Sequence, residues 1–204
     1  MNTSQIASLA GLLLLPWLGS GCIHITDEID LAYEPRGGRE VLSGAAAIPV
    51  QIQIMDQRPV QTDVGKVING FGGEIGEILS NQDVSTYIGG ILRTELDARG
   101  FGTGDQVKVD GKLTTFYNRF KMGFWAGDSI ADFALDVSVR QSDGTVLYSR
   151  NFTAQGIEPN IQVARGHNAK AALEKAAWNG VNELFQDPKF IAALYQAAGK
   201  EPPQ

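Results

Sequence analysis

The 204-residue chain holds few residues that could do chemistry. It has one cysteine, Cys22, and two histidines, His24 and His167. Ser-His-Asp catalysis needs a histidine, and neither histidine has a second ligand at metal-binding spacing. Asp56 and Arg58 are two residues apart, so on a strand they share a face, and a strand-end ion pair accounts for them. These residues predict no enzyme, no metal site and no bound cofactor.

Cys22 stands at the end of a distinctive leader. The segment from Ile6 to Leu18 is almost purely apolar, Gly19 to Gly21 are small, and no Asp, Glu, Lys or Arg precedes Asp27. The apolar run is shorter than the ~20 residues of a spanning helix and matches the ~7–15 residues of a secretory signal peptide. A single cysteine in an exported protein has no internal disulfide partner. One alternative is an unmodified cysteine after an ordinary signal peptide.

This leader resembles the lipobox of bacterial lipoproteins. The resemblance implies cleavage between Gly21 and Cys22, with residues 1–21 as the signal peptide. It also implies a diacylglycerol and an N-acyl chain, such as palmitate, on Cys22, which together anchor a protein stably at ~0.8 kcal/mol per buried methylene. Ile23 occupies the position directly after the cysteine, where an Asp would favour retention of the lipoprotein at the inner membrane. The implied location is therefore the outer membrane, facing the periplasm.

Composition and the positions of glycine and proline divide the rest of the chain into segments. A formal net charge of −6 argues against nucleic acid as a partner. Residues 22–47 contain five acids, three glycines and one proline and predict a flexible tether, although a short strand at 29–33 packed on the domain is an alternative. Residues 48–198 predict a single domain and residues 199–204 a disordered tail. Within the domain, the glycine-rich segment 60–82 contains the turn signal Asn69-Gly70 and predicts a mobile β-hairpin or an irregular flap.

Hydrophobic periodicity predicts an α+β fold with the order β-α-β-β-β-α. Asp83 and Gly100 supply the expected ends of the first helix. We expect a two-layer sandwich, with an antiparallel-dominated sheet of about four strands and two helices on one face. A crossover through the first helix should bring the first two strands together. The expected strands are 48–55, 106–117, 130–140 and 146–155, and the expected helices are 84–99, 169–186 and a short one at 190–198.

One aromatic and basic cluster stands out in this acidic protein. It falls at the end of the second expected strand and in the loop that follows. Such residue types are typical anchors of interfaces and also suit a membrane interface. The alternative is that the aromatic side chains cap the sheet or the core. The expected partner-contact residues are Tyr117, Arg119, Phe120, Lys121, Phe124 and Trp125.

Three segments resemble the YajG-type family of envelope lipoproteins: 50–58, ending in Asp-Gln-Arg; 96–101, Leu-Asp-Ala-Arg-Gly-Phe; and 151–156 before an Ala-rich helix. The element order also resembles PqiC-like auxiliary lipoproteins of lipid-transport systems. These resemblances imply an anchored accessory protein of the bacterial envelope, without catalysis and with an unidentified protein partner.

Two other functions are open from the sequence. One is a lipid- or glycan-binding subunit of a transport system, which needs a cavity lined by residues such as Tyr87, Phe133 and Trp178. The other is an envelope hydrolase, which needs His167 or the Asp56–Arg58 pair at a pocket.

Overall fold

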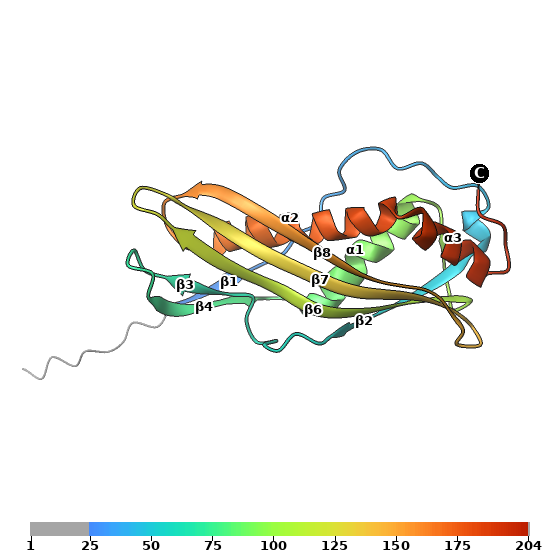
Figure 1. Cartoon of the computed structure of the whole chain (residues 1–204), viewed down its shortest axis with the longest axis horizontal. Helices are drawn as coiled ribbons and strands as arrows, with labels where there is room; N and C mark the ends of the chain where they lie inside the picture. The colour runs from blue at the N-terminus through green and yellow to red at the C-terminus, as the bar shows by residue number, and fades with distance from the viewer. Residues whose placement is uncertain (1–24, 204) are drawn as a thin grey trace, which may run out of the picture.

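Three long antiparallel strands form the centre of the fold (Figure 1). The computed structural model describes residues 25–203. The long strands are β6 (Val107–Met122), β7 (Gly127–Gln141) and β8 (Val146–Ile161). Helices α1 (Val84–Ala98) and α2 (Gly166–Gln186) cover one face of the sheet, and α3 (Pro188–Ala197) follows α2. No helix within residues 25–203 is long and apolar enough to cross a membrane.

Shorter strands complete the sheet along the free side of β6. The first half of β6 pairs in parallel with β2 (Pro49–Asp56), which also pairs with β5 (Gly102–Thr103). Further along the same side, β6 pairs in parallel with β3 (Gly65–Ile68). β3 pairs with β4 (Glu74–Ser80), and β4 pairs with β1 (Ile25–Ile29). Two separate ladders therefore follow one another along a single edge of β6.

Within residues 25–203 the sheet is mixed and has eight strands, which corrects the expected antiparallel-dominated sheet of about four strands, while α1, α2 and α3 lie where the sequence predicts helices. The expected order is present as β2, α1, β6, β7, β8 and α2, and the parallel pairing of β2 with β6 is confirmed. The expected flap contains β3 and β4, and the expected tether contains β1. Gly76 permits the contact between β4 and β1, because a Cβ there would meet the Ile25 carbonyl oxygen at 1.6 Å.

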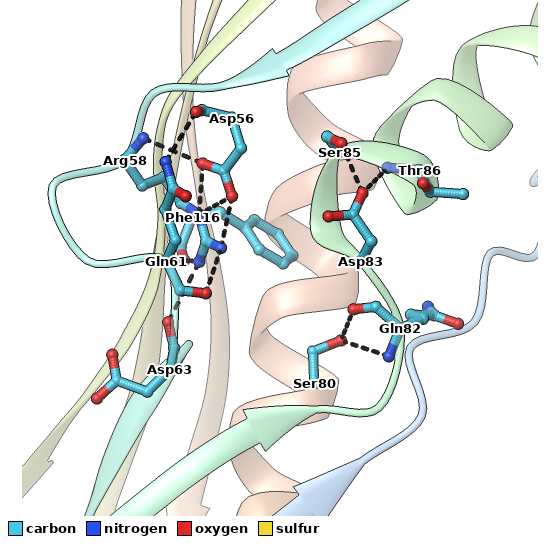
Figure 2. Close-up of polar contacts among 10 residues, drawn as sticks. All are labelled: Asp56, Arg58, Gln61, Asp63, Ser80, Gln82, Asp83, Ser85, Thr86 and Phe116. Carbon is cyan, nitrogen blue, oxygen red and sulfur yellow. Dashed lines mark hydrogen bonds and ion pairs between the residues drawn. The ribbon is translucent and has the colours of Figure 1, made fainter.

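The helix ends follow their local sequence. The Asp83 side chain accepts a hydrogen bond from the Thr86 backbone N–H, which caps α1 as expected (Figure 2). At the other end Gly100 adopts a φ of 88°, and the Phe101 N–H donates to the Leu96 carbonyl at 3.1 Å. This is the Schellman arrangement. A capped helix of this kind fixes where the chain leaves β4 and where it enters β5.

The core lies between the helices and one face of the long strands. Phe116 of β6 packs edge-on against Phe133 of β7 at 6.4 Å and against Tyr87 of α1 at 6.2 Å. Side chains on the other face of β6 and β7 are more exposed, among them Lys112 and Asp136. The sheet therefore has one buried and one wet face, as the alternating pattern predicts.

A buried ion cluster fastens the segment after β1 to α1. Glu95 is only 3% exposed and accepts hydrogen bonds from the Tyr33 hydroxyl and the Arg39 guanidinium, while Arg99 pairs with it at 2.6 Å. Burial alone would raise the pKa of Glu95, but the bonds from Arg39, Tyr33 and Arg99 outweigh it and lower the pKa to about 2. The segment from Tyr33 to Arg39, expected to belong to a tether, is therefore held on the domain.

Candidate functional site

A single arginine organises the loop that separates β2 from β3. Arg58 is 5% exposed, and its guanidinium contacts both carboxylate oxygens of Asp56, at 2.8 to 3.1 Å (Figure 2). Its Nη1 donates to the carbonyls of Asp63 at 3.2 Å and Phe116 at 3.3 Å. Phe116 belongs to β6, so the guanidinium supplies a donor to β6 where no neighbouring strand runs. The Asp56–Arg58 pair thus holds the sheet edge together.

A hollow opens where β3 leaves β6. Within the described chain, Gly65 with Asn118 is the only residue pair that joins these two strands. Beyond it lies a hollow of about 440 Å³ between β6 and the β3–β4 hairpin. Its wall includes Lys66, Tyr117, Asn118, Arg119 and Phe120. We call this hollow the β3–β6 groove.

A second hollow adjoins the β3–β6 groove on the side of the Arg58 loop. It measures about 380 Å³ and includes Pro59, Val60 and Phe116 in its wall. Lys66 and Tyr117 line both hollows, so the two lie side by side along β6, and we call them together the β6 depression. The depression is apolar near Val60 and more polar near Lys66.

The charge at the middle of this depression is fixed by a lysine and two acids. Lys66 contacts Asp63, which is 1% exposed, and lies 3.0 Å from Glu77. Hydrogen bonds to these two carboxylates raise the pKa of Lys66, so it stays protonated. Burial, together with the charge of Asp63, raises the pKa of Tyr117. Tyr117 is therefore a neutral hydrogen-bonding group in the groove at neutral pH.

Asn118 adds a polar side chain that is not fully satisfied. It is completely buried, and its Oδ1 accepts from the Ser129 hydroxyl at 2.6 Å. Its Nδ2 has no hydrogen-bond partner among the described residues. A buried donor without a partner is costly. Asn118 is part of the groove wall.

The structure divides the six expected contact residues into two groups. Tyr117, Arg119 and Phe120 line the β3–β6 groove. The other three, Lys121, Phe124 and Trp125, are exposed at the end of β6 and in the turn into β7. Arg119 also pairs with Asp132 on β7. The aromatic and basic cluster is thus partly a groove wall and partly a protruding turn.

Sequence reasoning missed several residues of this site. Asp63 and Asn118 are buried and Lys66 is partly buried only because segments far apart in sequence come together there. Phe71 was missed in the glycine-rich segment, where it protrudes from the β3–β4 turn. A single large apolar residue between Asn69 and Gly73 is a signal that could have identified it.

The remaining expected residues lie elsewhere. Gly21, Cys22 and His24 are outside the described residues. His167 is exposed in the first turn of α2. Within residues 25–203, no three His, Cys, Asp or Glu side chains are grouped so that they could hold a metal ion.

The residues expected to line a ligand cavity do not line either hollow of the depression. Tyr87 and Phe133 are buried and pack on Phe116 in the core. Arg36 lies over the Trp178 ring at 5.0 Å.

A family profile described as "Uncharacterized lipoprotein" matches residues 40–195. The chain belongs to this lipoprotein family. The match includes the Arg58 loop and the β3–β6 groove. A comparison with curated proteins finds no match.

Solved structures of low sequence identity are similar to this chain. The crystal structure of protein XCC0632 from Xanthomonas campestris has 15% identity and a TM-score of 0.50, and the match covers 78% of this chain and 92% of that one. A minor lipoprotein from Acinetobacter baumannii matches with 8% identity and a TM-score of 0.38, covering 68% of this chain and 93% of that one. The first of these likenesses supports the fold alone.

Proposed function

We propose that this lipoprotein is an accessory protein of the bacterial cell envelope, of the YajG type and without catalytic activity. It is anchored in the outer membrane through acyl chains on Cys22, which is the chain's only cysteine. Its domain faces the periplasm and binds an extended segment of another envelope protein. The membership of a lipoprotein family supports the anchor, and the β3–β6 groove supports the binding role.

The observation that carries the binding role is the separation of β3 from β6 after Gly65 and Asn118. An extended peptide can add to a sheet where a strand edge lacks a partner. The groove offers such an edge on β6 beyond Asn118. Tyr117 and Arg119 flank it, and these residue types often anchor interfaces. An incoming segment would satisfy polar groups and bury an aromatic ring at once.

Site-specific photocrosslinking in intact cells tests this role. A photoreactive phenylalanine analogue would replace Arg119 in the full-length acylated protein, and in a matched control it would replace Lys112. Both residues are exposed on β6, but Lys112 lies beside Asp136 and away from the groove. We expect one adduct of defined mass from the probe at position 119 and none from position 112. The same adducts from both positions, or no adduct from 119, would contradict the proposal.

A further inference from the structure

The point where the chain enters the sheet limits how far the domain can stand from its anchor. This inference rests on the acylation of Cys22 proposed above. Ile25 begins β1 and pairs with Gly76 of β4. Only three peptide units separate Cys22 from Ile25, and they span at most ~11 Å even when fully extended. The end of the sheet that contains Ile25 must therefore lie close to the membrane surface.

The same end of the sheet carries the exposed aromatic side chains. Phe71 is fully exposed in the β3–β4 turn, and Phe124 and Trp125 are 89% and 87% exposed in the β6–β7 turn. The β3–β4 turn begins just beyond the Gly76 region, because Ile68 is opposite Glu74. Both turns and the start of β1 lie at the left end in Figure 1, opposite the C-terminus. Anchor and aromatic side chains thus meet at one end of the molecule.

We propose that Phe71, Phe124 and Trp125 lie in the headgroup region of the membrane that holds the acyl chains of Cys22. Aromatic side chains favour this interface because it is apolar on one side and hydrated on the other. Phe124 and Trp125 contact each other edge to face at 4.8 Å and form one protruding wedge. Lys121, exposed at the end of β6, stands next to this wedge and can meet lipid phosphate.

Contact at two turns has a geometric consequence. The β3–β4 and β6–β7 turns are the tips of separate hairpins, so contact at both would hold the long strands at a steep angle to the membrane. The far end, with the β7–β8 turn and α3, would then point into the aqueous compartment (Figure 1). The β3–β6 groove would lie just above the headgroups.

Depth-dependent fluorescence quenching tests this arrangement. The full-length acylated protein would be reconstituted in vesicles of phosphatidylethanolamine and phosphatidylglycerol, with and without brominated acyl chains. After removal of the leader, Trp125 and Trp178 are the remaining tryptophans, so Trp178→Phe isolates Trp125. We expect brominated lipid to quench its emission. The control protein carries Trp125→Phe and Leu147→Trp in addition to Trp178→Phe. Its single tryptophan lies at the end of β8 that is far from position 125, and we expect no quenching of its emission.

A second probe provides a test that does not depend on the folding of the Trp178→Phe variant. Because Cys22 is acylated in the proposed mature protein, Phe71→Cys introduces the single free thiol, and Leu147→Cys is its matched control. A fluorophore on each thiol should report lipid contact only at position 71. Equal quenching at both ends, or none at either, would overturn the inference.

Vesicle flotation separates the two claims. If the protein floats with vesicles but Trp125 and the label at position 71 stay unquenched, the anchor stands and the aromatic contact is refuted. If the protein does not float, the proposed acylation fails and the contact fails with it.

Discussion

Replacing Glu95 with glutamine should remove much of the domain's stability at neutral pH. Glu95 joins α1 to the segment after β1 through Tyr33, Arg39 and Arg99. Its pKa falls from the ordinary 4.5 to about 2 in the folded protein. At ~1.36 kcal/mol per pKa unit, this difference corresponds to about 3 kcal/mol of folding free energy. Glu95→Gln keeps the size of the side chain but loses this contribution.

The pH dependence gives a sharper test. Because folding lowers the pKa of Glu95, its contribution is complete above pH 4.5 and is lost as the pH falls from 4.5 through about 2. Urea unfolding of wild type and Glu95→Gln should therefore differ by about 3 kcal/mol near pH 7 and by about 1.4 kcal/mol near pH 3. The matched control is Asp97→Asn on the same helix. Asp97 forms a more exposed pair with Arg93 at 2.7 Å, so this change should cost only about 0.5 kcal/mol.

The reasoning would be refuted if the unfolding free energies of wild type and Glu95→Gln stayed parallel across this pH range. It would also be refuted if Asp97→Asn cost as much as Glu95→Gln near pH 7. The first result would mean that the carboxylate of Glu95 gains nothing from its partners on folding, and the second that its buried pairs stabilise the fold no more than an exposed pair does.

Three further predictions have clear expected outcomes, and two of them have a control substitution. Arg58→Lys should lower the free energy of unfolding in urea by about 2 kcal/mol, because an ammonium group cannot reach all the carbonyls that the guanidinium reaches. The control, Arg119→Lys, changes an exposed site and should lower this free energy by less than about 0.5 kcal/mol. Gly156→Ala should lower the free energy of thermal unfolding by about 3 kcal/mol, because the new Cβ would lie 2.0 Å from the Ala172 carbonyl oxygen. The control, Gly90→Ala, places its Cβ in open space and should stabilise α1 by up to about 1 kcal/mol. Cys22→Ser should leave an uncleaved, unacylated precursor on mass spectrometry, and a mature acylated product would contradict the anchor.

Local sequence was sufficient to predict the elements that depend on neighbouring residues. The capping of α1 by Asp83 and its Schellman end at Gly100 involve only bonds within a few residues. The buried face of β7 follows from strict alternation over a long strand. Features of this kind carry their own signal, and the structure contains them where the sequence predicts them.

The short strands, which the sequence leaves open, depend on partners far along the chain. β1 is five residues long, includes three polar residues and pairs with residues about 50 positions later. β3 is four residues long and meets β6 at one residue pair. Such segments have too little periodicity to indicate a strand alone, and the glycines around β3 are equally compatible with a hairpin and with an irregular loop.

The candidate site also contains some residues that the local sequence indicates and others that only the complete fold brings together. The aromatic and basic residues of β6 stand out in the sequence because Tyr117, Arg119, Phe120 and Lys121 interleave two aromatic rings with two positive charges in an acidic protein. The burial of Asp63 and Asn118 cannot be recognised in the sequence, because it arises only when the Arg58 loop and β3 come to lie beside β6. Charged and amide side chains carry no sequence signal of burial unless their partners are known.

The anchor and the groove constrain which partner the protein can bind. Arg58 holds the loop that sends β3 back to β6, and β3 forms one wall of the groove. The other hairpin strand, β4, pairs with β1, whose first residue is within ~11 Å of the proposed acyl anchor. The groove and the anchor are therefore connected through adjacent strands with no linker between them. A domain held in this way cannot search the width of the periplasm. It follows that a partner for the groove must bring its own extended segment to the membrane surface, as a membrane protein or a second anchored lipoprotein would.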